Sequence, residues 1–119
     1  NLAKSVELEL EPGERVSTAF QVGEKLIEKT SQLKFRLHLW EYSNDDDLEV
    51  RLNGDALREL QAAGPARKST TGQWLECQLQ PRQVRKGENL VELLLRKRDE
   101  SIQPPIVMDA VQLHVRHTR

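Results

Sequence analysis

Two tryptophans, Trp40 and Trp74, lie in segments where apolar and polar residues alternate, and both occupy positions of the polar residues. An indole on the wet face of a strand offers a flat apolar surface on which the C–H face of a sugar ring stacks, while planar polar side chains replace the water lost by the hydroxyl groups. We therefore expect a ligand-binding surface here. The alternative is that each indole lies at the end of its strand, is covered by a neighbouring loop and forms part of the edge of the core. The residues that supply this combination are Arg36, His38, Trp40, Tyr42, Arg51, Trp74 and Glu76.

The remaining carboxylates and histidines have no spacing that predicts catalysis or a preformed metal site. The acidic run Asp45–Asp47 lacks the D-x-D-x-D-G pattern of a calcium loop and is interpreted as a solvated turn. Glu49 and Glu76 point outward and could in principle hydrolyse a glycoside, but no G-x-S-x-G elbow or phosphate-binding glycine loop is present. We expect a domain that is not an enzyme. The histidines, interpreted as surface residues without zinc-site spacing, are His38, His114 and His117.

The single cysteine is expected to be inert. Cys77 shares its alternation parity with Leu75 and Leu79, which places the thiol in the core, where a free cysteine behaves as a small hydrophobe. No partner exists within the chain for an internal disulfide.

Alternation of apolar and polar residues also predicts the elements that carry these side chains. The pattern runs through residues 6–10, 16–22, 33–40, 48–55, 74–79, 91–95 and 107–115, and it is typical of strands with one buried and one wet face. Residues 56–60 are an ambiguous return strand after the hairpin signal Asn53-Gly54, and residues 23–31 are a loop or a single helical turn. Asp109 has the parity of Val107 and Val111 and is therefore expected to point inward. The sequence predicts about eight antiparallel strands in a two-sheet β-sandwich.

If every connection reverses direction, alternate loops gather at one end of the sandwich. The loops expected to share this rim are 11–14, 42–47, 61–73 and 98–105.

Length and charge limit the number of domains and the kinds of partner. We expect one β-sandwich domain over residues 1–119, excised from a larger multidomain protein. The net charge of -1 with interspersed signs argues against nucleic acid and membrane partners, and no apolar run approaches a membrane span.

The order of the segments LEVRLNGD, WLECQLQP, RKGENLVELLL and PIVMDAVQLHV resembles the galactose-binding-like jelly roll, over roughly residues 34–116. Such domains are similar to accessory modules of secreted glycoside hydrolases, some of which bind carbohydrate while others only pack against a catalytic domain. The resemblance implies an extracellular location. It also implies that Asp109, in the last strand, helps to hold a structural calcium ion; a bulge or a backbone-capping role is the alternative.

The function predicted from these observations is a non-catalytic carbohydrate-binding module that brings an associated carbohydrate-active enzyme to glycan. The alternative is a structural accessory domain that buries the same face against a neighbouring catalytic domain and binds no sugar.

Overall fold

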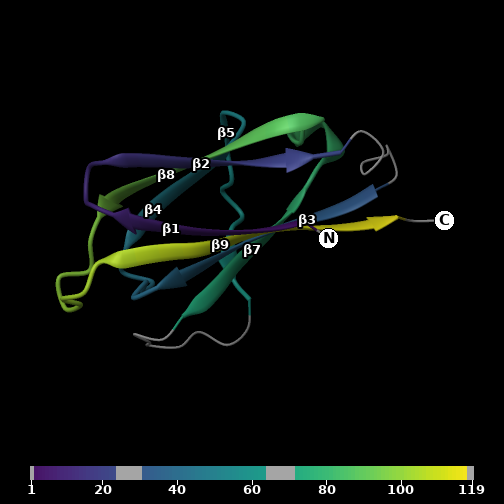
Figure 1. Ribbon diagram of the computed structural model, residues 1–119. Helices are drawn as coiled ribbons and strands as arrows, with labels where there is room; N and C mark the ends of the chain where they lie inside the picture. The colour runs from purple at the N-terminus through teal and green to yellow at the C-terminus, as the bar shows by residue number, and fades with distance from the viewer. Residues whose placement is uncertain (1, 24–30, 64–71, 118–119) are drawn as a thin grey trace.

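A computed structural model describes residues 2–23, 31–63 and 72–117 of the chain. Within these ranges it contains nine strands and one short 3₁₀ helix (Figure 1). Residues 24–30 of the expected loop or helical turn over residues 23–31, and residues 64–71 of the long loop over residues 61–73, lie outside the described residues. In chain order the elements are β1 (Leu2–Leu10), β2 (Arg15–Val22), β3 (Ser31–Trp40), β4 (Asp47–Leu52), β5 (Asp55–Ala56), β6 (Gln61–Ala62), β7 (Gln73–Leu79), η1 (Pro81–Gln83), β8 (Gly87–Lys97) and β9 (Ile106–His117).

The strands form two antiparallel sheets that pack face to face. One sheet has the order β1-β9-β3-β7-β6 and the other β2-β8-β4-β5. The chain passes repeatedly from one sheet to the other, which is compatible with a jelly roll. The predicted antiparallel two-sheet sandwich is confirmed. The strand count differs slightly, because the segment after the hairpin forms only the two-residue strands β5 and β6.

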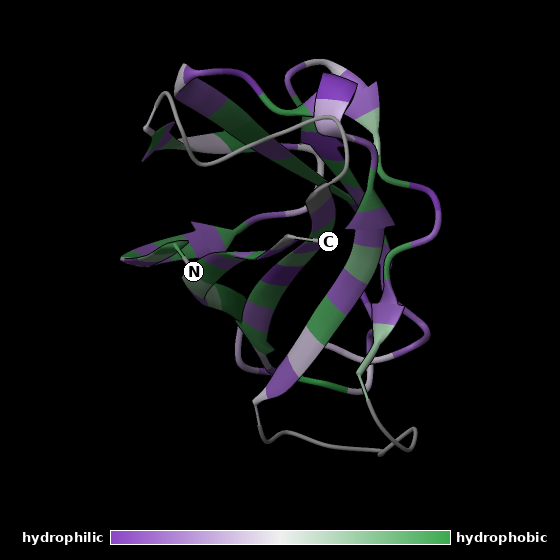
Figure 2. Cartoon of the chain, turned by 90° about the vertical axis from the view of Figure 1, so that its right-hand side faces the viewer, coloured by the Kyte–Doolittle hydropathy of each residue, from purple (hydrophilic) through white to green (hydrophobic). Residues whose placement is uncertain are grey.

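Alternation along the strands produces the core. Figure 2 shows hydrophilic and hydrophobic residues alternating along most strands, so each sheet has an apolar and a polar face. Phe35, Leu37 and Leu39 of β3 are completely buried, together with apolar residues of β7 and β9 in the same sheet and of β8 in the opposite sheet. Burial of one such side chain contributes about 1.5–3 kcal/mol. Val6 and Leu8 of β1, which were expected to face inward, are half-buried against this core.

Two asparagines close one end of the sandwich. Asn53 and Gly54 both have positive φ, 51° and 89°, and form the predicted hairpin between β4 and β5. Asn89 is fully buried, and the oxygen and the nitrogen of its side-chain amide each make two hydrogen bonds. Its Oδ1 accepts from the Arg85 backbone N–H and from Asn53 Nδ2, and its Nδ2 donates to the carbonyls of Arg85 and Gly87. The turn before β8 is therefore held by a side chain rather than by strand pairing.

A buried ion pair ties two loops together at the other end. Arg98 Nη1 donates to both carboxylate oxygens of Asp46 at 2.8 Å, and the Ser43 N–H donates to the same carboxylate. Arg98 Nη2 also donates to the Pro104 carbonyl. The interpretation of the acidic turn as solvated is therefore wrong for Asp46, whose side chain is buried, although its two acidic neighbours are exposed. The arginine that neutralises it comes from another loop, which no local pattern reveals.

The prediction that alternate loops share one rim agrees with these contacts. The Asp46–Arg98 pair joins the loop after β3 to the loop after β8. The N–H of Gly13, in the turn after β1, donates to the Leu95 carbonyl near the same end. Gln73, which follows the long loop, donates through Nε2 to the Tyr42 carbonyl.

Candidate binding site

A β-bulge places Asp109 on the outer face of the sheet. Ala110 pairs with His38 and Met108 pairs with Leu39, so Asp109 is an extra residue with no partner on β3. Such a residue reverses the alternation of its strand. Met108 and Val111 are consequently both buried, although they differ in parity. The prediction that Asp109 points inward is wrong, and the bulge that was its alternative is present.

The carboxylate of Asp109 accepts hydrogen bonds from two rings of the neighbouring strand. His38 Nδ1 lies 2.7 Å from Oδ1, and Trp40 Nε1 donates to Oδ2 at 2.8 Å. Partial burial alone would raise the pKa of Asp109, but the hydrogen bonds from Trp40 and His38 outweigh it and hold the pKa below its ordinary value. The carboxylate therefore stays ionised at neutral pH.

His38 lies at the centre of this arrangement. Its ring meets Trp40 edge-on at 5.2 Å and Trp74 at a tilt at 4.9 Å, both between centroids. A Cβ atom built on Gly72 would collide with the same ring, so the backbone approaches it closely. Only 15% of the His38 side chain is exposed, so its interpretation as a surface histidine is wrong. We call His38, Trp40, Trp74 and Asp109 the indole cluster.

A row of polar side chains continues from the indole cluster across the same face. Arg36 stacks on Trp74, with its Cζ 4.4 Å from the ring centroid, and its Nε lies 3.1 Å from Glu76 Oε2. Arg36 Nη1 donates to Gln112 Oε1, and His114 Nε2 lies 2.9 Å from the same oxygen. Partial burial, together with the charge of Arg36, lowers the pKa of His114 below its usual range. We call Arg36, Glu76, Gln112 and His114 the polar row.

The structure brings together five of the seven residues predicted for the binding surface and separates two. Arg36, His38, Trp40, Trp74 and Glu76 share the outer face of β3 and β7. The other two lie elsewhere, in a cleft at the edge of the sandwich.

The separation of Tyr42 and Arg51 has a structural cause in each case. Glu41 has a φ of 61°, a left-handed conformation that ends β3 and turns Tyr42 back against the core. Arg51 is on β4, which belongs to the other sheet. Alternation predicts which face of a strand a residue occupies, but it does not predict which sheet the strand joins.

Sequence reasoning did not select Gly72, Gln112 and His114 for this surface. Gln112 and His114 have the outward parity of β9, which lies beside β3, so a predicted strand order would have identified them. The approach of Gly72 to an imidazole leaves no signal in the sequence beyond the glycine itself.

The described residues contain no group of three or more His, Cys, Asp and Glu side chains arranged to hold a metal ion. The carboxylate that was a candidate calcium ligand instead accepts from two rings. The Cys77 thiol is buried as predicted, and desolvation, with the nearby charge of Glu59, raises its pKa to about 11. Neither the Asp109 carboxylate nor the Cys77 thiol suggests a reactive group at the indole cluster.

A scan against protein-family models and a search of curated proteins give no match to this chain. Within the described ranges there is no helix with the length and apolar character needed to span a bilayer.

Proposed function

We propose that this domain is a non-catalytic carbohydrate-binding module, of the galactose-binding-like jelly-roll kind, that attaches a secreted carbohydrate-active enzyme to glycan. One observation carries the proposal: Trp40 is exposed to 42% and yet is fixed in place by Asp109 and His38. An exposed indole usually retains rotational freedom, whereas this one is held by a charge-assisted hydrogen bond and an edge-on ring contact.

A fixed indole is suited to weak ligands. Stacking of a sugar ring gives a small gain, and ordering of a mobile side chain would remove about 0.5–1.5 kcal/mol of it. Val107 of β9 pairs with Trp40 of β3 and extends the apolar surface beside the indole. The contact area remains small, so we expect dissociation constants in the range of roughly micromolar to millimolar.

The polar row would contact the hydroxyl groups of the bound sugar. Arg36, Glu76 and Gln112 are planar groups on the same face as the indoles, and Glu76 retains acceptor capacity after pairing with Arg36. Arg36 covers one face of Trp74, so Trp40 is the main stacking surface and Trp74 supports the cluster from the side.

The second candidate is a structural accessory domain that packs this face against a catalytic domain of the same parent protein. It is favoured by the fact that the polar side chains of the face are paired with one another. Hydrogen bonds made within the face would be kept if another protein surface covered it.

Affinity electrophoresis through gels that contain a panel of polysaccharides separates the two candidates. The native domain is compared with Trp40→Ala and with Leu90→Ala, which removes an exposed apolar side chain from the other sheet as a matched control. Glycan binding predicts retardation of the native domain and of Leu90→Ala, with loss in Trp40→Ala. Absence of retardation in all three across the panel would overturn the proposal in favour of the structural one, and equal retardation of all three would show that Trp40 is not the stacking surface.

A further inference from the structure

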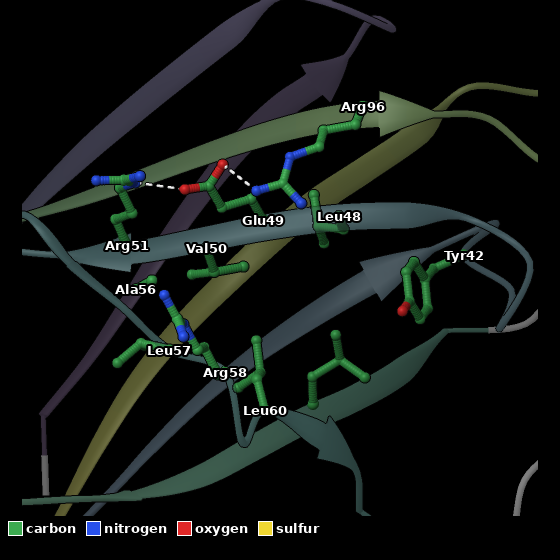
Figure 3. Close-up of a pocket in the computed structure, with 11 residues that line it drawn as sticks. Tyr42, Leu48, Glu49, Val50, Arg51, Ala56, Leu57, Arg58, Leu60 and Arg96 are labelled. Carbon is green, nitrogen blue, oxygen red and sulfur yellow. Dashed lines mark hydrogen bonds and ion pairs between the residues drawn. The ribbon is translucent and has the colours of Figure 1, made fainter.

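A second concave site lies at the edge of the sandwich, away from the indole cluster. Strands β5 and β6 each have two residues, and β5 pairs with β4 only at Arg51 and Leu52. The sheets are therefore uncovered between β4 and β7, where a cleft of about 470 Å³ opens (Figure 3). That volume is in the range of sites for small molecules.

The floor of the cleft is apolar. It is lined by Leu48 and Val50 of β4, by Leu57 and Leu60 from the segment after β5, and by Leu75 of β7. These side chains belong to the core or pack against it, so the floor is fixed by the fold. A ligand seated here would place an apolar face on these residues.

The wall of the cleft is cationic. Three guanidinium groups, of Arg51, Arg58 and Arg96, line it together with a single carboxylate, that of Glu49. Glu49 lies between Arg51 and Arg96, pairs with both, and has a side chain only 10% exposed (Figure 3). Hydrogen bonding from Arg51, assisted by Arg96, lowers the pKa of Glu49 despite the opposing effect of desolvation, so the carboxylate holds both arginines at neutral pH.

Two polar groups of the cleft have no partner among the described residues. No hydrogen bond or ion pair joins Arg58 to another described side chain, so its guanidinium is free to bind an anion. The hydroxyl of Tyr42 likewise has no such partner, and Figure 3 shows the phenol ring turned toward the cleft. Burial, with the charges of Asp46 and Asp47, raises the pKa of Tyr42, so its hydroxyl stays protonated and can donate.

We propose that this cleft binds a small organic carboxylate whose ring has an apolar face. Arg58 pairs with the carboxylate, the leucine-lined floor contacts the ring, and Tyr42 donates to a polar substituent. The fork of the guanidinium matches a carboxylate in a bidentate manner. A hexuronic acid and an aromatic acid share this chemistry, and the site is independent of the indole cluster.

Titration of the domain with sodium glucuronate, sodium benzoate and neutral glucose, followed by amide chemical shifts, tests the proposal. We expect saturable shifts at residues 48–60 with one or both carboxylates and none with glucose. A response to glucuronate alone assigns an acidic sugar, and a response to benzoate alone assigns an aromatic acid. Arg58→Gln should weaken binding about tenfold or more, and Tyr42→Phe about threefold.

Arg82→Gln is the matched control, because Arg82 is an exposed arginine on η1 that does not line the cleft. It should give the same shifts at residues 48–60 as the native domain. The thermal midpoint of Arg58→Gln checks that the variant is folded, and its exposed side chain predicts no change. The proposal is overturned if neither carboxylate gives saturable shifts at residues 48–60, if glucose shifts these residues equally, or if Arg58→Gln and Arg82→Gln have the same affinity.

Discussion

Replacement of Asp109 by alanine tests the indole cluster most directly. The change removes the acceptor of the Trp40 and His38 hydrogen bonds. Hydrogen bonds to a charged group contribute about 1.5–3 kcal/mol each. Because 39% of the carboxylate side chain is exposed, screening by solvent reduces this to about 1 kcal/mol each. We expect the free energy of unfolding to fall by about 2 kcal/mol and the thermal midpoint by roughly 8 °C.

The effect of Asp109→Ala should depend on pH with a definite sign. The folded protein has a lower Asp109 pKa than the unfolded chain, so this carboxylate stabilises the fold above the unfolded value of about 4 and less as the pH falls through the folded value. The difference between native and variant should therefore be full at pH 7 and shrink below about pH 4.

Urea unfolding followed by tryptophan fluorescence measures this difference at each pH. Asp45→Ala is the control, because Asp45 is exposed and its carboxylate has no hydrogen-bond partner among the described residues. The reasoning is refuted if Asp109→Ala costs less than about 0.5 kcal/mol at pH 7, the level of an ordinary surface change. It is equally refuted if the difference from the native domain is the same at pH 7 and pH 3.

Three further changes test other parts of the structure. Asn89→Ala leaves several polar groups without their partner and should lower the free energy of unfolding in urea by about 3 kcal/mol, whereas Asn44→Ala, at an exposed turn, should change it by less than about 0.5 kcal/mol. Gly72→Ala should destabilise by about 1–3 kcal/mol in calorimetry, because the new methyl group meets a confined imidazole; Gly23→Ala has open space and should not. Alkylation of Cys77 by iodoacetamide should be slow at pH 8 and accelerate toward its pKa of about 11; a rate that levels off near pH 9, as for an ordinary thiol, would contradict the raised pKa.

The fold could be predicted from the sequence because burial on one face imposes a period of two on every long strand. Phe35, Leu37 and Leu39 are fully buried, and Arg36 and His38 between them lie on the outer face, as alternation requires. The short strands β5 and β6 could not be predicted, since two residues are too few to show a period.

The site could be predicted only in part, because it depends on contacts between distant segments. Alternation placed Trp40 and Trp74 each on the outer face of its own strand, but the carboxylate that fixes Trp40 comes from a residue 69 positions later. A bulge moves that residue from the expected inner face to the outer one, and only pairing with β3 reveals it. The partner of the buried Asp46, Arg98, is non-local in the same way.

The bulge leaves the packing of β9 in the core unchanged and places Asp109 on the outer face. Without Asp109, the sequence from Ile106 to Leu113 would alternate regularly, with Met108 and Val111 both facing inward as they do in the structure. The extra residue therefore adds nothing to the packing of the sandwich, and it interrupts the hydrogen-bond ladder of β9 with β3. What it adds is a carboxylate placed between His38 and Trp40 on the outer face. The hydrogen bonds that this carboxylate accepts from the two rings offset the loss of regular pairing.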